Sequence, residues 1–184
     1  VDALSTGDDM AFKKFGLAVL ILLCSVATAH AAWRDISVLN GAVTLSAPDN
    51  FGPMPVHLRP MPYPGIERPL VMLSDPDGRV ILSVNHTRAE VQDDIRMIRK
   101  TMSAVFHQSY RQAVWLRDEV EELNGRRYAV FEFVVPEDGV STHNILYATR
   151  LHGTLLMINF KTPEQGDPQW LEAGRAMLSS LRLR

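Results

Sequence analysis

Residues 114–135, VWLRDEVEELNGRRYAVFEFVV, carry the clearest fold signal in this chain of 184 residues. Polar and apolar side chains alternate along both halves, which is typical of strands with one face against a core. The halves meet at Asn124-Gly125, a dipeptide that strongly favours a tight hairpin turn. We therefore predict two antiparallel strands, Val114 to Leu123 and Arg127 to Val135.

The strand pattern continues toward the C-terminus and then gives way to a helix. Ser141 to Arg150 and Thr154 to Phe160 are strand-like and follow turn sequences that contain Gly139 and Gly153. Asp167 is placed to cap a closing helix whose first turn holds Pro168. The expected buried stripe of this helix is Trp170, Leu171, Gly174, Met177, Leu178 and Leu181.

Toward the N-terminus the sequence predicts two more hairpins and one helix. Strands at Ile36–Leu39 and Ala42–Ala47 flank Asn40-Gly41, and strands at Leu70–Ser74 and Arg79–Asn85 flank Asp75-Pro-Asp-Gly. Thr87 and Glu90 fit a capping box for an amphipathic helix from about Ala89 to Gln108. We accordingly interpret Asn85-His-Thr as a strand end and helix cap rather than as a glycosylation site.

The order of these elements indicates an α+β domain. Strands joined by tight turns pair antiparallel, and the two helices have apolar faces that need a sheet to cover. We predict an antiparallel β-sheet flanked by two main helices, in one domain over residues 32–184.

The segment from Met10 to Ala31, MAFKKFGLAVLILLCSVATAHA, resembles a cleavable secretory signal. Two lysines precede an eleven-residue apolar run, which is shorter than the roughly 20 residues that span a bilayer. We expect translation to begin at Met10, so that residues 1–9 are an over-called start or a remnant. We expect the signal to be cleaved after Ala29 or Ala31. The mature protein should then be periplasmic or secreted, without a transmembrane anchor.

The composition of the mature chain excludes several classes of function. The only cysteine, Cys24, lies in the leader after Leu23, whereas a lipoprotein signal needs a small residue before its cysteine. The mature chain therefore has no disulfide and no thiolate chemistry. The whole chain has a formal net charge of −2, so no basic field attracts nucleic acid. We expect no cofactor and no metal, and a monomer or weak dimer.

A proline-rich loop at residues 48–69 holds seven of the eleven prolines. A long loop of this kind is usually functional or disordered, and its stiffness lowers the cost of ordering on binding. We predict a partner-binding surface here, with coverage of a sheet edge as the alternative. Its candidate contact residues are Phe51, Met54, His57, Arg59, Met61, Tyr63 and Arg68.

Polar residues of the second half offer weaker candidates. Four carboxylates, Asp118, Glu119, Glu121 and Glu122, form an acidic patch on one predicted strand. We interpret it as a solvated edge strand whose charges discourage pairing, with a cation or basic-partner site as the alternative. His143 can face Glu132 on the preceding strand, but no nucleophile motif accompanies it, so we assign no catalytic residue.

Three short motifs resemble PsbP-like and DcrB-like domains. They are the opening strand and corner Gly41 to Phe51, the central strand Leu123-Asn-Gly-Arg-Arg-Tyr, and Leu151-His-Gly-Thr-Leu-Leu-Met-Ile-Asn-Phe. The resemblance implies an α/β/α sandwich around an antiparallel sheet. Members of that fold are generally non-enzymatic binding proteins, which include photosystem subunits, a Ran-binding factor, and periplasmic immunity proteins against type VI effectors.

Together these features predict an exported, non-enzymatic protein that binds another protein. In its most specific form, the prediction is an immunity protein that neutralises a secreted envelope-targeting effector. The alternative is a periplasmic small-ligand carrier or enzyme that uses the sheet–helix interior or the acidic strand.

Overall fold

The computed structural model describes residues 32–59, 71–137 and 139–184, which belong to one compact unit, Ala31–Arg184. Its elements run in the order β1 (Trp33–Val38), β2 (Val43–Pro48), β3 (Gly52–Pro53), a short 3-10 helix (Val56–Leu58), β4 (Val71–Ser74), β5 (Ile81–Glu90), α1 (Ile95–Ser109), β6 (Val114–Leu123), β7 (Arg126–Glu137), β8 (Val140–Leu151), β9 (Thr154–Pro163), α2 (Pro168–Ser179) and β10 (Arg182–Leu183). Among these residues no helix is both long enough and apolar enough to span a membrane.

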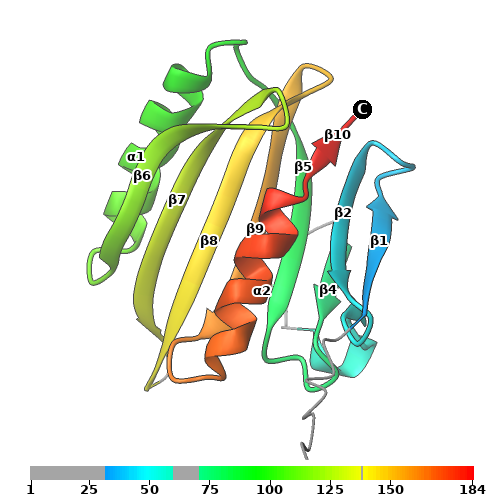
Figure 1. Ribbon diagram of the computed structural model, residues 1–184. Helices are drawn as coiled ribbons and strands as arrows, with labels where there is room; N and C mark the ends of the chain where they lie inside the picture. The colour runs from blue at the N-terminus through cyan, green and yellow to red at the C-terminus, as the bar shows by residue number, and fades with distance from the viewer. Residues whose placement is uncertain (1–31, 60–70, 138) are drawn as a thin grey trace, which may run out of the picture. The chain divides into compact units, whose positions relative to one another are not determined.

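Two antiparallel sheets organise this unit. The larger has seven strands in the order β3-β4-β5-β9-β8-β7-β6, and the smaller has the order β1-β2-β10 (Figure 1). The strands on either side of Asn124-Gly125 pair antiparallel, from Leu123 opposite Arg126 to Val114 opposite Val134. The predicted α+β class is therefore confirmed.

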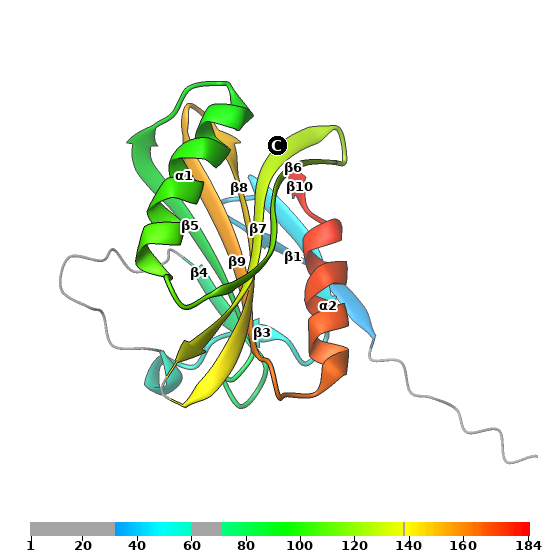
Figure 2. The same cartoon turned by 90° about the vertical axis from the view of Figure 1, so that its left-hand side faces the viewer.

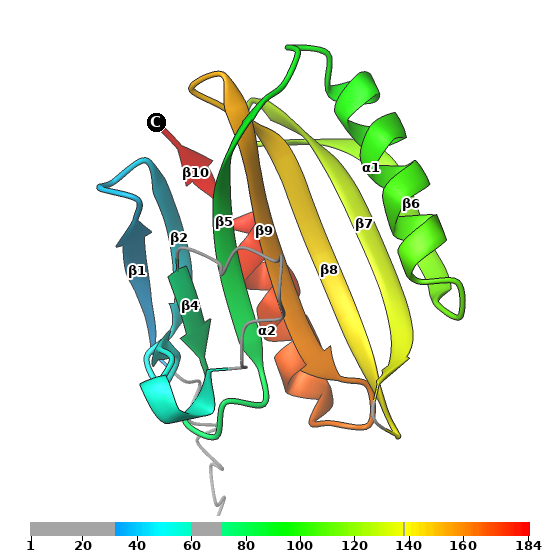
Figure 3. The same ribbon diagram turned by 180° about the vertical axis from the view of Figure 1, so that it is seen from behind.

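The two helices lie on opposite faces of the large sheet, as the view along the sheet shows (Figure 2). On one face α1 packs across β6, β7 and β8, which is the arrangement seen from behind in Figure 3. Here Ile95, Ile98 and Met102 are buried against Phe131 and Phe133. The other face carries α2 together with the small sheet.

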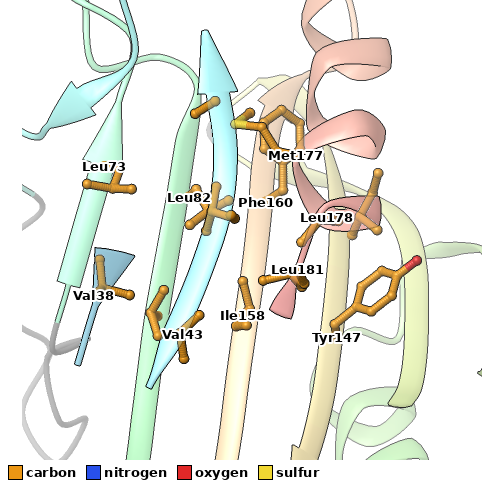
Figure 4. Packing of buried hydrophobic residues seen from close by; sticks show 14 of the residues in the cluster. Val38, Val43, Leu73, Leu82, Tyr147, Ile158, Phe160, Met177, Leu178 and Leu181 are labelled. Carbon is orange, nitrogen blue, oxygen red and sulfur yellow. The ribbon is translucent and has the colours of Figure 1, made fainter. Parts of the chain in front are cut away.

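The core beneath α2 is closely packed. Met177, Leu178 and Leu181 point toward Ile158 and Phe160 of β9 (Figure 4). Gly174 permits this approach, because a Cβ at that position would lie 2.3 Å from the ring of Phe160. Asp167 caps α2 as predicted, since its side chain accepts a hydrogen bond from the amide of Gln169.

The predicted start of the first helix is wrong. α1 begins at Ile95 with Asp94 as its cap, whose carboxylate accepts a hydrogen bond from the amide of Arg96. The proposed capping box lies instead within β5, which continues to Glu90 opposite Thr154 of β9.

The proline-rich loop is also less irregular than predicted. Its first part contains β3 and the short 3-10 helix. Pro53 is tolerated in a strand because β3 is the edge of the sheet, where one row of amides needs no partner. Strand β10 was not predicted from the sequence at all.

Candidate functional site

Among the described residues, a connected group of charged and polar side chains lies on the α2-facing side of β6, β7 and β8, around the buried Glu132. Figure 1 shows α2 crossing β8 and β9, with β6 and β7 extending beyond the helix. We call the polar residues on this face the charge network: Arg117, Glu119, Glu121, Glu132, His143, Tyr147 and Arg175.

Glu132 on β7 is the centre of the charge network and is only 2% exposed. Its Oε1 atom accepts hydrogen bonds from Nε2 of His143 at 2.7 Å and from Nη2 of Arg175 at 2.7 Å. These donors come from β8 and α2, so the carboxylate ties the helix to the sheet. The hydrogen bond from His143 and the charge of Arg175 lower the pKa of Glu132 to about 2, although burial alone would raise it.

Arg117 on β6 forms the second half of the charge network. Its guanidinium donates to Glu119 at 2.7 Å and to Glu121 at 2.6 Å. The hydroxyl of Tyr147 on β8 donates to the same Glu121 at 3.0 Å. Burial and the neighbouring Glu121 raise the pKa of Tyr147 to about 12, so it stays a neutral donor at physiological pH.

An open hollow of about 410 Å³ adjoins the charge network at the start of β6. We call it the β6 hollow; its lining residues are Gln112, Val114, Leu116, Val134, Pro136, Ser141, His143 and Glu164. Val114 is 63% exposed and Leu116 is 51% exposed, which is high for aliphatic side chains. His143 is 6% exposed, so it reaches both the hollow and the buried Glu132.

The pair of His143 and Glu132 has only part of what catalysis needs. An ionised Glu132 must accept its hydrogen bond, so Nε2 of His143 carries the proton. Ser141 also lines the hollow, but His143 makes no hydrogen bond to a hydroxyl within the described residues. Nor does this part of the chain contain three metal-ligating side chains in one group. The arrangement orients an imidazole without presenting a nucleophile to it.

The four carboxylates of the predicted acidic patch do not share one surface. Asp118 faces α1, where it receives hydrogen bonds from Arg99 at 2.8 Å and Ser103 at 2.5 Å. Glu119 and Glu121 face the other way and are paired with Arg117. Glu122 is exposed. β6 is the outermost strand of its sheet, which is the position that the edge-strand interpretation expects.

The candidate residues of the proline-rich loop divide into three groups. Phe51 and Met54 are 0% and 2% exposed, and Phe51 packs against Trp170. These two side chains belong to the core and do not form a surface, which corrects the expectation for them. His57 and Arg59 are exposed. The other three candidates, Met61, Tyr63 and Arg68, lie outside the described residues.

Sequence reasoning missed Arg117, Arg175 and Leu116. The alternation of strand residues does indicate that Arg117 shares a face with Glu119 and Glu121. No comparable signal connects Arg175 with Glu132, because they are 43 residues apart and meet only when α2 packs on the sheet. Leu116 is exposed where the register of β6 shifts between Trp115 and Arg117.

Comparison with known proteins identifies the fold. No family model matches the sequence, and no curated protein matches it. The structure resembles cyanobacterial PsbP from Synechocystis, with a TM-score of 0.57 and 15% identity over 86% of this chain and 96% of that one. It also resembles the Ran-binding protein Mog1p of Saccharomyces cerevisiae, with a TM-score of 0.52 and 12% identity over 84% and 96% of the two chains.

A third solved structure with this arrangement is LpqN, a Mycobacterium tuberculosis protein involved in cell envelope biogenesis. Its TM-score is 0.50 at 9% identity, over 83% of this chain and 90% of that one. At such identities the likeness concerns the fold and carries no activity with it. The described part of this chain has the PsbP-like α+β fold.

Proposed function

We propose that this protein is an exported, non-enzymatic module that binds another protein through the β6 hollow. The observation that carries the proposal is the exposure of Val114 and Leu116 around that hollow on an edge strand. Exposed aliphatic side chains that gather at a concave surface are typical of interaction sites.

The charge network supports this role because it makes one wall of the hollow rigid. His143 is fixed by Glu132, and Glu132 is fixed in turn by Arg175 of α2. A surface that is ordered before binding loses less conformational entropy when a partner arrives. The interior between sheet and α2 is filled by Phe160, Met177 and Leu178, so it offers no support for a carrier that encloses its ligand there.

The most specific form of the proposed function is an immunity protein that neutralises a secreted envelope-targeting effector. The expected signal at residues 10–31 and the modest size of the domain support this form. An immunity protein is expected to be encoded beside its toxin. Co-production of this protein with a toxin identified in that way should restore growth, and no restoration would remove the immunity role while leaving protein binding in place.

Capture of partners by the immobilised protein from envelope extract tests the binding surface. We expect Leu116→Asp to abolish capture, because a carboxylate would have to be desolvated in the contact. Val105→Asp is the matched control, since Val105 is 55% exposed on α1. Arg59→Ala tests the proline-rich loop in the same assay. Equal loss in the Val105 variant, or no loss in the Leu116 variant, would contradict the proposed surface.

A further inference from the structure

A second hollow, of about 270 Å³, lies where the β6–β7 hairpin meets the C-terminal strand β10. Three leucines form part of its wall, and its polar lining comes from Asn124, Arg126, Tyr128 and Arg182. The volume is sufficient for one small group with a few attached atoms. We call it the hairpin hollow.

Both walls of the hairpin hollow are held in place by hydrogen bonds. The side chain of Asn124 donates from Nδ2 to the carbonyl of Leu181 at 2.8 Å and to that of Ser179 at 3.2 Å. These bonds attach the hairpin to the end of α2. On the other side, Arg182 and Leu183 pair with β2, so the hollow is formed before any ligand enters.

The hairpin hollow is positively charged, because Arg126 and Arg182 line it and no carboxylate lies among its lining residues. Arg126 donates from Nη1 to the backbone carbonyl of Arg150 at 3.0 Å, which orients its guanidinium without cancelling its charge. Neither Arg126 nor Arg182 forms an ion pair with a carboxylate among the residues that the structure describes. Planar guanidinium groups match the geometry of carboxylate and phosphate oxygens.

Tyr128 adds a neutral donor beside these charges. The residue is 1% exposed, and its ring packs against Tyr147 in a T-shaped contact with centroids 5.6 Å apart. Within the described part of the chain its hydroxyl has no hydrogen-bond partner. The hydroxyl oxygen is not sealed from solvent, and the hollow that Tyr128 lines is where an acceptor can reach it. Burial also raises the pKa of Tyr128, which keeps the proton on the hydroxyl.

We propose that the hairpin hollow binds a small oxyanion, a phosphate or carboxylate group, between Arg126 and Arg182 with the hydroxyl of Tyr128 as a further donor. This site is separate from the β6 hollow: the two share no lining residue. The proposal therefore does not depend on protein binding there.

Titration of the purified protein by ¹H–¹⁵N NMR tests this proposal. Sodium phosphate and sodium acetate serve as probes, and sodium chloride at equal ionic strength is the reference. We expect saturable shifts at residues 124–128 and 181–183 with at least one probe. The probe that binds shows whether phosphate or carboxylate is preferred, and the absence of saturable shifts with both would overturn the proposal.

Substitutions locate the site within the same titration. Arg126→Gln, Arg182→Gln and Tyr128→Phe should each weaken binding by about tenfold or more, which is typical for loss of one hydrogen bond to a charged group. Arg127→Gln is the matched control, because Arg127 is exposed and does not line the hollow. If Arg126→Gln perturbs the fold by losing its bond to Arg150, the exposed Arg182 still provides the test. Equal affinity in the Arg182 and Arg127 variants would refute the site.

Discussion

Replacing Glu132 by glutamine should remove most of the loss in the free energy of unfolding that this protein undergoes as the pH falls below 4.5. The fold lowers the pKa of Glu132 from 4.5 to about 2. The difference between these values corresponds to about 3 kcal/mol of stabilisation, at about 1.4 kcal/mol for each pH unit. Because the folded-state pKa is the lower one, the stabilisation is complete above pH 4.5 and is lost as the pH falls toward 2.

Urea unfolding followed by circular dichroism at several pH values between 2 and 7 measures this effect. For the unchanged protein we expect the free energy of unfolding to fall most steeply between pH 4.5 and 2. The Glu132→Gln variant should be less stable by about 3 kcal/mol at pH 7. The two proteins should approach equal stability at about pH 2 and below, where the glutamate of the folded protein becomes protonated.

Glu172→Gln is the matched control, because Glu172 is paired with the same Arg175 but its side chain is 75% exposed. An exposed pair of this kind contributes about 0–1 kcal/mol, so this variant should keep the acid dependence of the unchanged protein. If Glu132→Gln also kept that dependence, or lost less stability at pH 7 than Glu172→Gln, the role assigned to the buried carboxylate would be refuted.

Two further changes test the packing of the helices. Gly174→Ala should lower the free energy of unfolding by about 1–3 kcal/mol, because the added Cβ would lie 2.3 Å from the ring of Phe160 and overpack the core. Calorimetry measures the loss, and an unchanged melting temperature would contradict the close contact. Asp118→Asn should weaken the attachment of α1 to β6, since Asp118 pairs with Arg99 at 2.8 Å and with His107 at 3.4 Å. Hydrogen exchange should then become faster in the C-terminal half of α1, and equal exchange in both proteins would show that apolar packing alone holds the helix.

The sequence alone was sufficient for the parts of the fold that rest on local chemistry. Asn124-Gly125 and the alternation around it define the β6–β7 hairpin, and Asp167 with Pro168 defines the start of α2. The contact between His143 and Glu132 was also predictable. The Cα partner of His143 is Val134, so the two side chains meet diagonally across neighbouring strands, as long side chains can.

Local signals failed where a distant strand competed for the same residues. Thr87 and Glu90 have the spacing of a capping box, yet the backbone there extends β5 along β9. The register shifts after His86, and Glu90 pairs again with Thr154 of β9, whereas the first turn of a helix satisfies few backbone groups. The helix therefore starts later, at Asp94. In the same way, Phe51 looked like a surface residue among prolines, although it is buried against Trp170 from α2.

The candidate site could be predicted only in part, because its charges come from three strands and a helix. The sequence identified the carboxylates of β6, but it could not show that Arg117 neutralises Glu119 and Glu121. It also gave no sign that Arg175 reaches Glu132, since that contact depends on how α2 lies across the sheet.

The position of the charge network argues that it shapes a surface as well as stabilising the fold. Buried ion pairs are often no more stabilising than apolar side chains of the same volume, so stability alone is a weak reason for Glu132, His143 and Arg175 to meet under α2. Their contact fixes His143 in the wall of the β6 hollow. Loss of Glu132 should therefore weaken both stability and partner capture, whereas loss of Leu116 should weaken capture alone.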